Sequence, residues 1–228
     1  MSVSFQYPFA FSVRENYDFA SFLAGAANAP LLAYLQAFPV NQDAFCLLWG
    51  QQGSGKTHLL QALCQAQAQS LYLPLEQLRG YGPEVLQGLA GHELLVLDDL
   101  DAVVGQLAWE ECLFQIFDTA LRERRKLCCA STLAPAALSF ALPDLRSRLQ
   151  LALTFELRPA DPATRAALLQ QVARRRGMEL KDEVADYLLS RHQRDWPALL
   201  ALLDQLDHSS LAQQRRLTIP FIKEQLGW

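Results

Sequence analysis

Gly50-Gln51-Gln52-Gly53-Ser54-Gly55-Lys56-Thr57 is the stretch of sequence that decides the fold. It fits the pattern G-x-x-x-x-G-K-[ST], whose glycines let backbone N–H groups curl around an anion without a Cβ in the way. The apolar run Phe45–Trp49 precedes the loop, and a helical pattern starts at Lys56. The loop therefore joins a strand to the positive end of a helix, as in a P-loop nucleotide-binding protein.

Each polar group of the loop has an expected role. Lys56 is expected to reach the β- and γ-phosphates, and Thr57 to ligate Mg²⁺. A chance glycine turn is the alternative, and the flanking strand and helix disfavour it. The expected cofactors are ADP or ATP with Mg²⁺, held by Gly50, Gly53, Ser54, Gly55, Lys56 and Thr57.

A second motif is the apolar run Leu94–Asp98, which ends in two carboxylates. At the carboxyl edge of a parallel sheet this end faces the ligand crevice. We expect Asp98 to hold Mg²⁺ and Asp99 to position or deprotonate an attacking water. The alternative is an acidic turn in which Asp99 caps the next segment. Ser131 and Thr132, at the end of another apolar run, are the candidates for sensing the γ-phosphate.

Short apolar runs alternate with amphipathic segments from Phe45 to residue 158. This alternation predicts a parallel sheet covered by helices on both faces. The strand at 70–75, inserted between the two motifs, favours the additional-strand class of P-loop ATPases. Strands are expected at 45–49, 70–75, 94–98, 127–131 and 151–156, and helices at 56–67, 83–89, 107–123 and 134–138.

After Arg158-Pro159 only helical patterns follow. Asp161-Pro162 is a helix start, with a carboxylate N-cap and proline in the first turn, and Gly177 is its stop. Further helices are expected at 181–191, 197–213 and 220–226. The predicted organisation is an arm (1–16), a P-loop α/β domain (17–158) with a five-stranded parallel sheet, and a small helical lid (159–228).

Composition narrows the class of protein. With 228 residues, 51% hydrophobic, and a net charge of -4, the chain is expected to be globular and not to be chiefly a holder of bare nucleic acid. Its basic clusters, 122–126 and 174–176, are typical of solvated helix faces and leave direct DNA contact open. No signal peptide or membrane span is expected, and five cysteines without C-x-x-C spacing indicate a reduced, cytoplasmic protein.

With these motifs in place, the whole chain resembles the AAA+ module of the DnaA family, and within it the regulatory Hda group. Only the P-loop motif is specific when taken alone. The other segments support the resemblance because they occur together and in the same order as in the family. The resemblance implies that Phe22 lines the adenine pocket. The segments that carry it are 18–22 with Gly25, Trp109, 142–149, 203–207 and 217–224.

The resemblance also implies partners and a mechanism. Arg148 matches the family's arginine finger, which acts on the nucleotide of a neighbouring subunit; Arg146 is the lesser candidate, and a surface pair with Asp144 or another acid is the alternative. We expect no helix-turn-helix domain after the lid and no long interaction domain before the arm, which would suit a regulator of the initiator DnaA. This chain is then expected to contact DNA only indirectly, through its partners.

Residues 6–11 resemble the hexapeptide by which this group grips the DNA sliding clamp. Gln6 would hydrogen-bond while aromatic anchors enter an apolar groove; the alternative is a strap packing on its own domain. The clamp-binding candidates are Gln6, Tyr7, Phe9 and Phe11, with Ala10 in place of the usual proline.

One departure from the family limits the enzymatic expectation. Pro197 stands where the family has a second-sensor arginine, and Arg194 precedes the expected helix. We therefore expect this chain to have weak or no ATPase activity of its own and to hold ADP as a conformational cofactor. The leading hypothesis is a clamp-bound regulator that stimulates ATP hydrolysis by DnaA. A loader or adaptor for another replication protein and an autonomous ATPase using Asp99 stay open, as does self-association.

Overall fold

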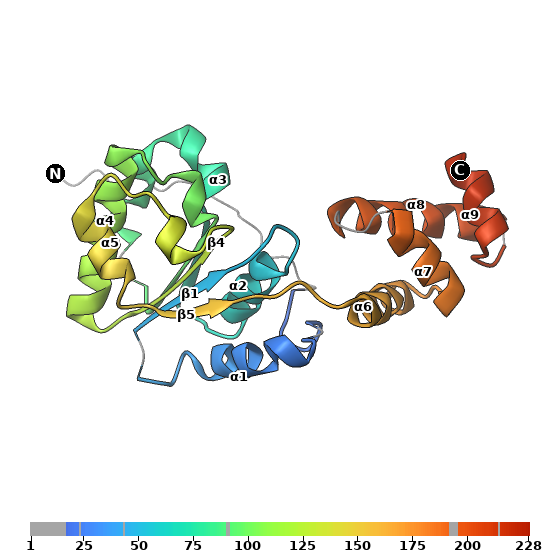
Figure 1. Ribbon diagram of the computed structural model, residues 1–228, viewed down its shortest axis with the longest axis horizontal. Helices are drawn as coiled ribbons and strands as arrows, with labels where there is room; N and C mark the ends of the chain where they lie inside the picture. Colours follow the sequence, from blue (N-terminus) through green and yellow to red (C-terminus); the bar gives the residue numbers. More distant parts are fainter. Residues whose placement is uncertain (1–16, 23, 43, 90–91, 192–195, 214) are drawn as a thin grey trace. The chain divides into compact units, whose positions relative to one another are not determined.

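The structure is a computed structural model that describes residues 17–22, 24–42, 44–89, 92–191, 196–213 and 215–228. The chain divides into two compact units (Figure 1). The first takes in the described residues up to Pro159 apart from a short segment around Gly25, and the second contains that segment and Ala160–Trp228.

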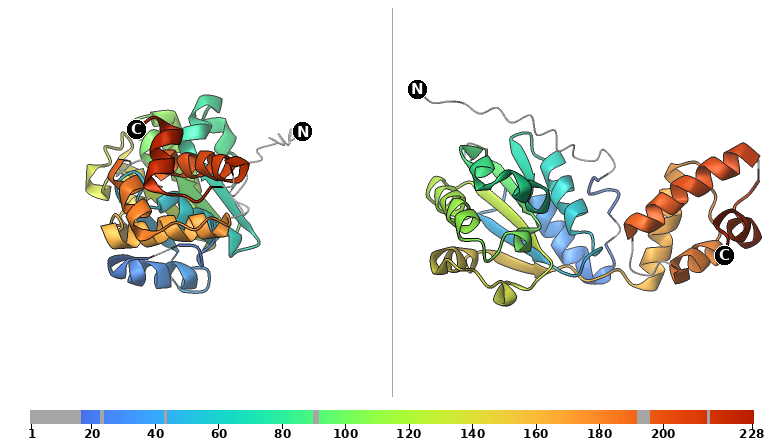
Figure 2. Two further views of the ribbon diagram at one scale, coloured as in Figure 1. Left: turned by 90° about the vertical axis from the view of Figure 1, so that its right-hand side faces the viewer. Right: turned by 90° about the horizontal axis from the view of Figure 1, so that it is seen from above.

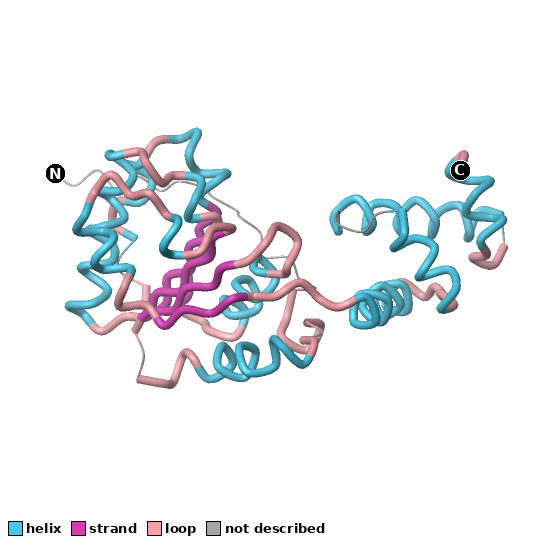
Figure 3. The backbone as a smooth tube through the Cα atoms, in the orientation of Figure 1, coloured by secondary structure: helices cyan, strands magenta, loops and turns pink. Residues whose placement is uncertain are grey.

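The first unit is built on five parallel strands, drawn in magenta in Figure 3. Their order across the sheet is β2-β3-β4-β1-β5, so β4 lies between the strand before the P-loop and the acidic strand. This is the additional-strand arrangement, and the predicted five-stranded parallel sheet is confirmed. The strands are β1 (Phe45–Trp49), β2 (Ser70–Pro74), β3 (Leu94–Asp98), β4 (Lys126–Ser131) and β5 (Leu153–Glu156).

Helices cover both faces of this sheet (Figure 2). Successive side chains of a strand point to opposite faces, so Cys46 and Leu48 join one buried cluster while Phe45 and Leu47 join the other. The first cluster includes α1 (Ala29–Ala37) and α2 (Lys56–Gln65), and the second includes α3 (Leu75–Leu78), α4 (Leu107–Glu123) and α5 (Pro143–Leu149).

Several predicted boundaries differ from the structure. The helices expected at 83–89 and 134–138 are wrong: short 3-10 turns stand there, and Gln87 is already extended before Gly88 takes a positive φ of 76°. The strand expected at 70–75 ends at Pro74 because Leu75 begins α3, and the strand expected at 151–156 begins at Leu153. The 3-10 turns are Ala26–Asn28, Arg79–Tyr81, Pro83–Leu86, Leu100–Ala102 and Pro135–Ala137.

The second unit is helical, as predicted. Its first helix begins as the sequence indicates, because the Asp161 carboxylate accepts the N–H of Thr164 at 2.9 Å, and it ends before Gly177, whose φ is +78°. An apolar cluster that includes Leu169, Leu188 and Phe221 forms the core of this unit. The helices are α6 (Pro162–Arg175), α7 (Asp182–Arg191), α8 (Trp196–Gln213) and α9 (Ile219–Leu226).

The five cysteines are free thiols, four of them buried. Within the described ranges, no helix is both long and apolar enough to cross a membrane.

Candidate functional site

The glycine-rich loop connects β1 to α2 and is pinned between two neighbouring segments. Gly50 donates its N–H to the Ser131 carbonyl at 3.2 Å. A Cβ on Gly50 would lie 2.4 Å from the Leu157 carbonyl oxygen, so only glycine fits there. Gly53 and Gly55 have φ values of 77° and 104°, in the region where side chains are strained. The predicted glycines are therefore required by the backbone path of the loop.

Lys56 and Ser54 give this loop the donors that a phosphate needs. Lys56 is buried, with 6% of the residue exposed, and its ammonium donates to the carbonyls of Gly50 at 2.8 Å and Gln51 at 3.1 Å. Its pKa is lowered by burial, against the opposing pull of Asp98 and the other nearby carboxylates. The Ser54 hydroxyl is buried and has no hydrogen-bond partner in the described part of the chain. An anion with several oxygens fits these groups.

An aromatic wall stands next to the loop. Phe22 packs so close that a Cβ on Gly55 would lie 2.7 Å from its ring. His58, the residue after Thr57 in α2, meets Phe22 edge to face with ring centroids 5.4 Å apart and stacks on Tyr17 at 4.6 Å. Its Nε2 donates to the Asp18 carbonyl at 2.9 Å. Sequence reasoning gave His58 no role, although its place in the first turn of α2 is the signal that was available.

Asp98 is held rigidly at the end of β3. Its side chain is buried, with 1% of the residue exposed. The Tyr72 hydroxyl donates to Oδ2 at 2.8 Å, and the Asp99 N–H donates to Oδ1 at 3.0 Å. Burial, followed by the neighbouring Asp98, raises the pKa of Tyr72, so its hydroxyl stays a donor. Sequence reasoning missed Tyr72, which lies on β2 and is 26 residues from Asp98.

Asp99 is one of two described non-glycine residues with positive φ, at 55°. Its pKa is raised to about 6, chiefly by burial, then by Asp98 and Asp101, while Lys56 lowers it. At neutral pH the carboxylate is therefore mostly ionised and able to accept a proton. Oxygen ligands such as those of Asp98 and Thr57 suit Mg²⁺.

The two expected sensor residues are already engaged. Ser131 is fully buried, and its Oγ accepts the N–H of Leu133 at 3.0 Å. Thr132 donates its N–H to Asp101 at 2.9 Å and its hydroxyl to the other oxygen of the same carboxylate. Burial raises the pKa of Asp101, but the hydrogen bonds that its carboxylate accepts, first those from Thr132 and then those from its own backbone and Ser131, together hold the pKa below its usual value. Asp101, which sequence reasoning did not single out, thus ties β3 to β4.

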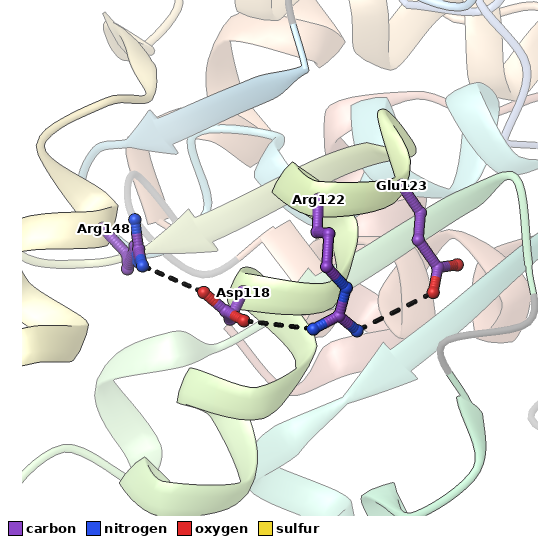
Figure 4. Close-up of polar contacts among 4 residues, drawn as sticks. All are labelled: Asp118, Arg122, Glu123 and Arg148. Carbon is purple, nitrogen blue, oxygen red and sulfur yellow. Dashed lines mark hydrogen bonds and ion pairs between the residues drawn. The ribbon is translucent and has the colours of Figure 1, made fainter.

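Arg148 lies on α5 and reaches across to α4 (Figure 4). Its Nη2 is 2.9 Å from Oδ1 of Asp118, and the two side chains are 40% and 36% exposed. Its guanidinium lies 5.9 Å from the centre of the Phe114 ring. The acid that pairs with it is therefore Asp118 and not Asp144. Arg146, also on α5, is exposed and forms no ion pair with any residue that the structure describes.

Several predicted positions fall in parts of the chain that the structure does not describe. The clamp-binding candidates Gln6, Tyr7, Phe9 and Phe11 lie outside the described residues, and so does Arg194. The backbone of Pro197 lies in the first turn of α8.

Comparisons with known proteins agree with this geometry. Residues 162–226 match the family model for the lid domain of Hda. Residues 46–130, which run from β1 through β4, match a family model named RNA helicase; this part contains the P-loop and the acidic strand.

Solved structures of DnaA share the fold. Domain III of the Thermotoga maritima replication initiation protein DnaA aligns with a TM-score of 0.81 at 20% identity, over 93% of this chain and 96% of that one. DnaA bound to AMPPCP and single-stranded DNA aligns with a TM-score of 0.70 at 22% identity, over 89% of this chain and 69% of that one. The Thermotoga maritima RuvB Holliday junction branch migration motor aligns with a TM-score of 0.65 at 17% identity, over 88% of this chain and 67% of that one.

The sheet order, the P-loop and the acidic strand define a P-loop protein of the AAA+ class. Within that class the helical unit is similar to one kind of lid, because residues 162–226 match the lid domain of Hda. The chain therefore has the AAA+ P-loop fold that DnaA also has, and its helical unit is similar to the lid domain of Hda.

Proposed function

We propose that this chain regulates DNA replication. While this chain is bound to the sliding clamp on DNA, it would stimulate ATP hydrolysis in the initiator DnaA. The observation that carries the proposal is the placement of Arg148 on α5. Its side chain is 40% exposed, and of the guanidinium nitrogens only Nη2 is hydrogen-bonded among the described residues. The Hda-type lid supports the same assignment.

Arg148 suits the task of an arginine finger. A guanidinium is always charged and offers N–H donors in a planar fork that matches phosphate oxygens. Brought against the ATP of DnaA, it would stabilise the negative charge that develops on the transferred phosphoryl group. Because the finger is supplied by this chain and the nucleotide by its partner, hydrolysis depends on their association.

The chain's own P-loop is proposed to bind ADP or ATP with Mg²⁺. Lys56, Ser54 and the loop N–H groups would hold the phosphates, Phe22 would face the base, and Thr57 with Asp98 would hold the metal. Mg²⁺ supplies charge neutralisation on the phosphate oxygens. The DnaA structure bound to AMPPCP supports a nucleotide at this place in the fold. With Pro197 at the expected sensor position, bound ADP serves as a conformational cofactor.

The clamp contact is proposed from the sequence of residues 6–11 alone. Capture of the chain by immobilised clamp is expected to fall when Gln6→Ala and Phe9→Ala are combined. Unchanged capture by the double variant would remove the clamp from the proposal and leave the role of Arg148 standing.

The proposed function is tested by measuring phosphate release from ATP-loaded DnaA in the presence of clamp-loaded DNA. The parent chain is expected to accelerate release, and Arg148→Ala to abolish the acceleration. Arg146→Ala, which removes the same charge from the same helix, is the matched control and should behave as the parent. Equal stimulation by Arg148→Ala and the parent would refute the finger.

Asp99 favours a second candidate, an autonomous ATPase. Its carboxylate is half-buried near Lys56, with a pKa of about 6, and is able to accept a proton from water at neutral pH. This alternative predicts steady ATP turnover by the isolated chain that is lost in Asp99→Asn. The leading proposal predicts turnover near background in both proteins.

A further inference from the structure

One face of α4 forms a short row beneath Arg148. Phe114, Asp118 and Arg122 are spaced four residues apart, so their side chains lie along one side of the helix. Figure 4 shows Asp118 between the two arginines. Its Oδ1 accepts from Arg148, and its Oδ2 lies 3.6 Å from Nη1 of Arg122. The Arg148 guanidinium also lies near the Phe114 ring, at 5.9 Å.

This ion pair is not what holds α5 in place. Leu145 and Leu149 are buried in the same apolar cluster as Leu113 and Phe117 of α4. An ion pair between two partly exposed side chains adds little to this burial, because water screens it and ordering the side chains opposes it. The contact therefore determines where the Arg148 side chain points more than it determines the fold.

Arg148 keeps most of its donors available while it is held. Asp118 engages Nη2, and neither Nη1 nor Nε has a hydrogen-bond partner among the residues that the structure describes. A guanidinium bound at one nitrogen can meet phosphate oxygens with the others. Asp118 can thus remain bound to Arg148 while the finger is in use, and the side chain does not need to be ordered afresh on each encounter.

We propose that Asp118 is the positioning residue for Arg148: it orients the finger along α4 toward the partner's nucleotide. This inference rests on the proposed function. The opposite role is a restraint, in which Asp118 competes with the phosphate and must release Arg148 before hydrolysis. The two roles give opposite signs when the charge of Asp118 is removed.

The experiment measures stimulated ATP hydrolysis by DnaA as a function of the concentration of this chain, with clamp-loaded DNA. Asp118→Asn is expected to lower the maximal rate about two- to fivefold, the range set by partly exposed ion pairs, with an unchanged half-saturating concentration. Asp118→Glu should restore most of the rate. Glu123→Gln is the matched control, because Glu123 pairs with Arg122 and Arg125 and not with Arg148.

Each outcome decides between the roles. A maximal rate for Asp118→Asn equal to or above the parent's would overturn positioning, and so would a change confined to the half-saturating concentration, which would indicate a docking contact. A lower urea midpoint for Asp118→Asn would make the effect structural. If the parent itself fails to stimulate, the proposed function fails; if the parent stimulates and Arg148→Ala does not, a normal Asp118→Asn overturns this inference alone.

Discussion

Tyr72→Phe removes a single hydroxyl from beside the buried carboxylate at the end of β3. The substitution leaves the ring in place and removes the hydrogen bond to Asp98 at 2.8 Å, together with the hydroxyl's interaction with Gln61. A buried hydrogen bond to a charged acceptor contributes about 1.5–3 kcal/mol to stability. Asp98 keeps one partner, the N–H of Asp99, but its second oxygen is left buried without a donor.

The expected loss corresponds to a measurable shift in unfolding. With a slope of about 2 kcal/mol per M urea, the midpoint of the α/β unit should fall by about 1 M. Amide hydrogen exchange across a urea series reports the two units separately. Peptides from β3 should therefore lose protection in Tyr72→Phe at lower urea than in the parent, while peptides from α7 should not change.

Tyr187 offers a matched control in the lid. Its hydroxyl is also buried but has no hydrogen-bond partner among the described residues. Tyr187→Phe is chemically the same change, yet it removes an unsatisfied group and should leave the stability of the lid unchanged or slightly raised. A Tyr72→Phe protein as stable as the parent, or equal losses in both variants, would refute the reasoning.

Two further predictions concern the same site. Gly50→Ala should destabilise the α/β unit by about 1–3 kcal/mol and weaken binding of a fluorescent ADP, because its Cβ would meet the Leu157 carbonyl at 2.4 Å; Gly80→Ala, which meets nothing within 4 Å, should change neither the urea midpoint nor the titration. The pKa of Asp99 is raised to about 6 in the folded chain, so folding favours its protonated form, and stability is lost as pH rises from about 4 to 6. Asp99→Asn should therefore stabilise the nucleotide-free protein by about 1 kcal/mol at pH 7.5, allowing for solvent screening, and not at all at pH 4; a gain of equal size at both pH values would contradict this assignment.

Local sequence predicted the elements whose signals are continuous. The apolar runs Phe45–Trp49 and Leu94–Asp98 are strands with the bounds expected, and the long amphipathic helix Leu107–Glu123 also agrees. Short segments were predicted less well. The 3-10 turns Pro83–Leu86 and Pro135–Ala137 carry few residues, so no helical period distinguishes them from helices.

Contacts between distant residues were not predictable from the sequence. The partner of Arg148 is Asp118, 30 residues away on another helix, and the acids near it in sequence gave no indication of this. The bond from Tyr72 to Asp98 depends on β2 and β3 being neighbours in the sheet. Strand order and helix packing determine both contacts, and no regular residue spacing in the sequence indicates either of them.

The central claim is that Arg148 acts on a nucleotide held by another protein. The direct measurement is a single-turnover experiment in which DnaA is loaded with labelled ATP, this chain with unlabelled ADP, and both are mixed with clamp-loaded DNA. The account predicts rapid hydrolysis of the labelled ATP with the parent chain and hydrolysis near background with Arg148→Ala. Labelled ATP that stays intact with the parent, while ATP loaded on this chain is hydrolysed without DnaA, would contradict it.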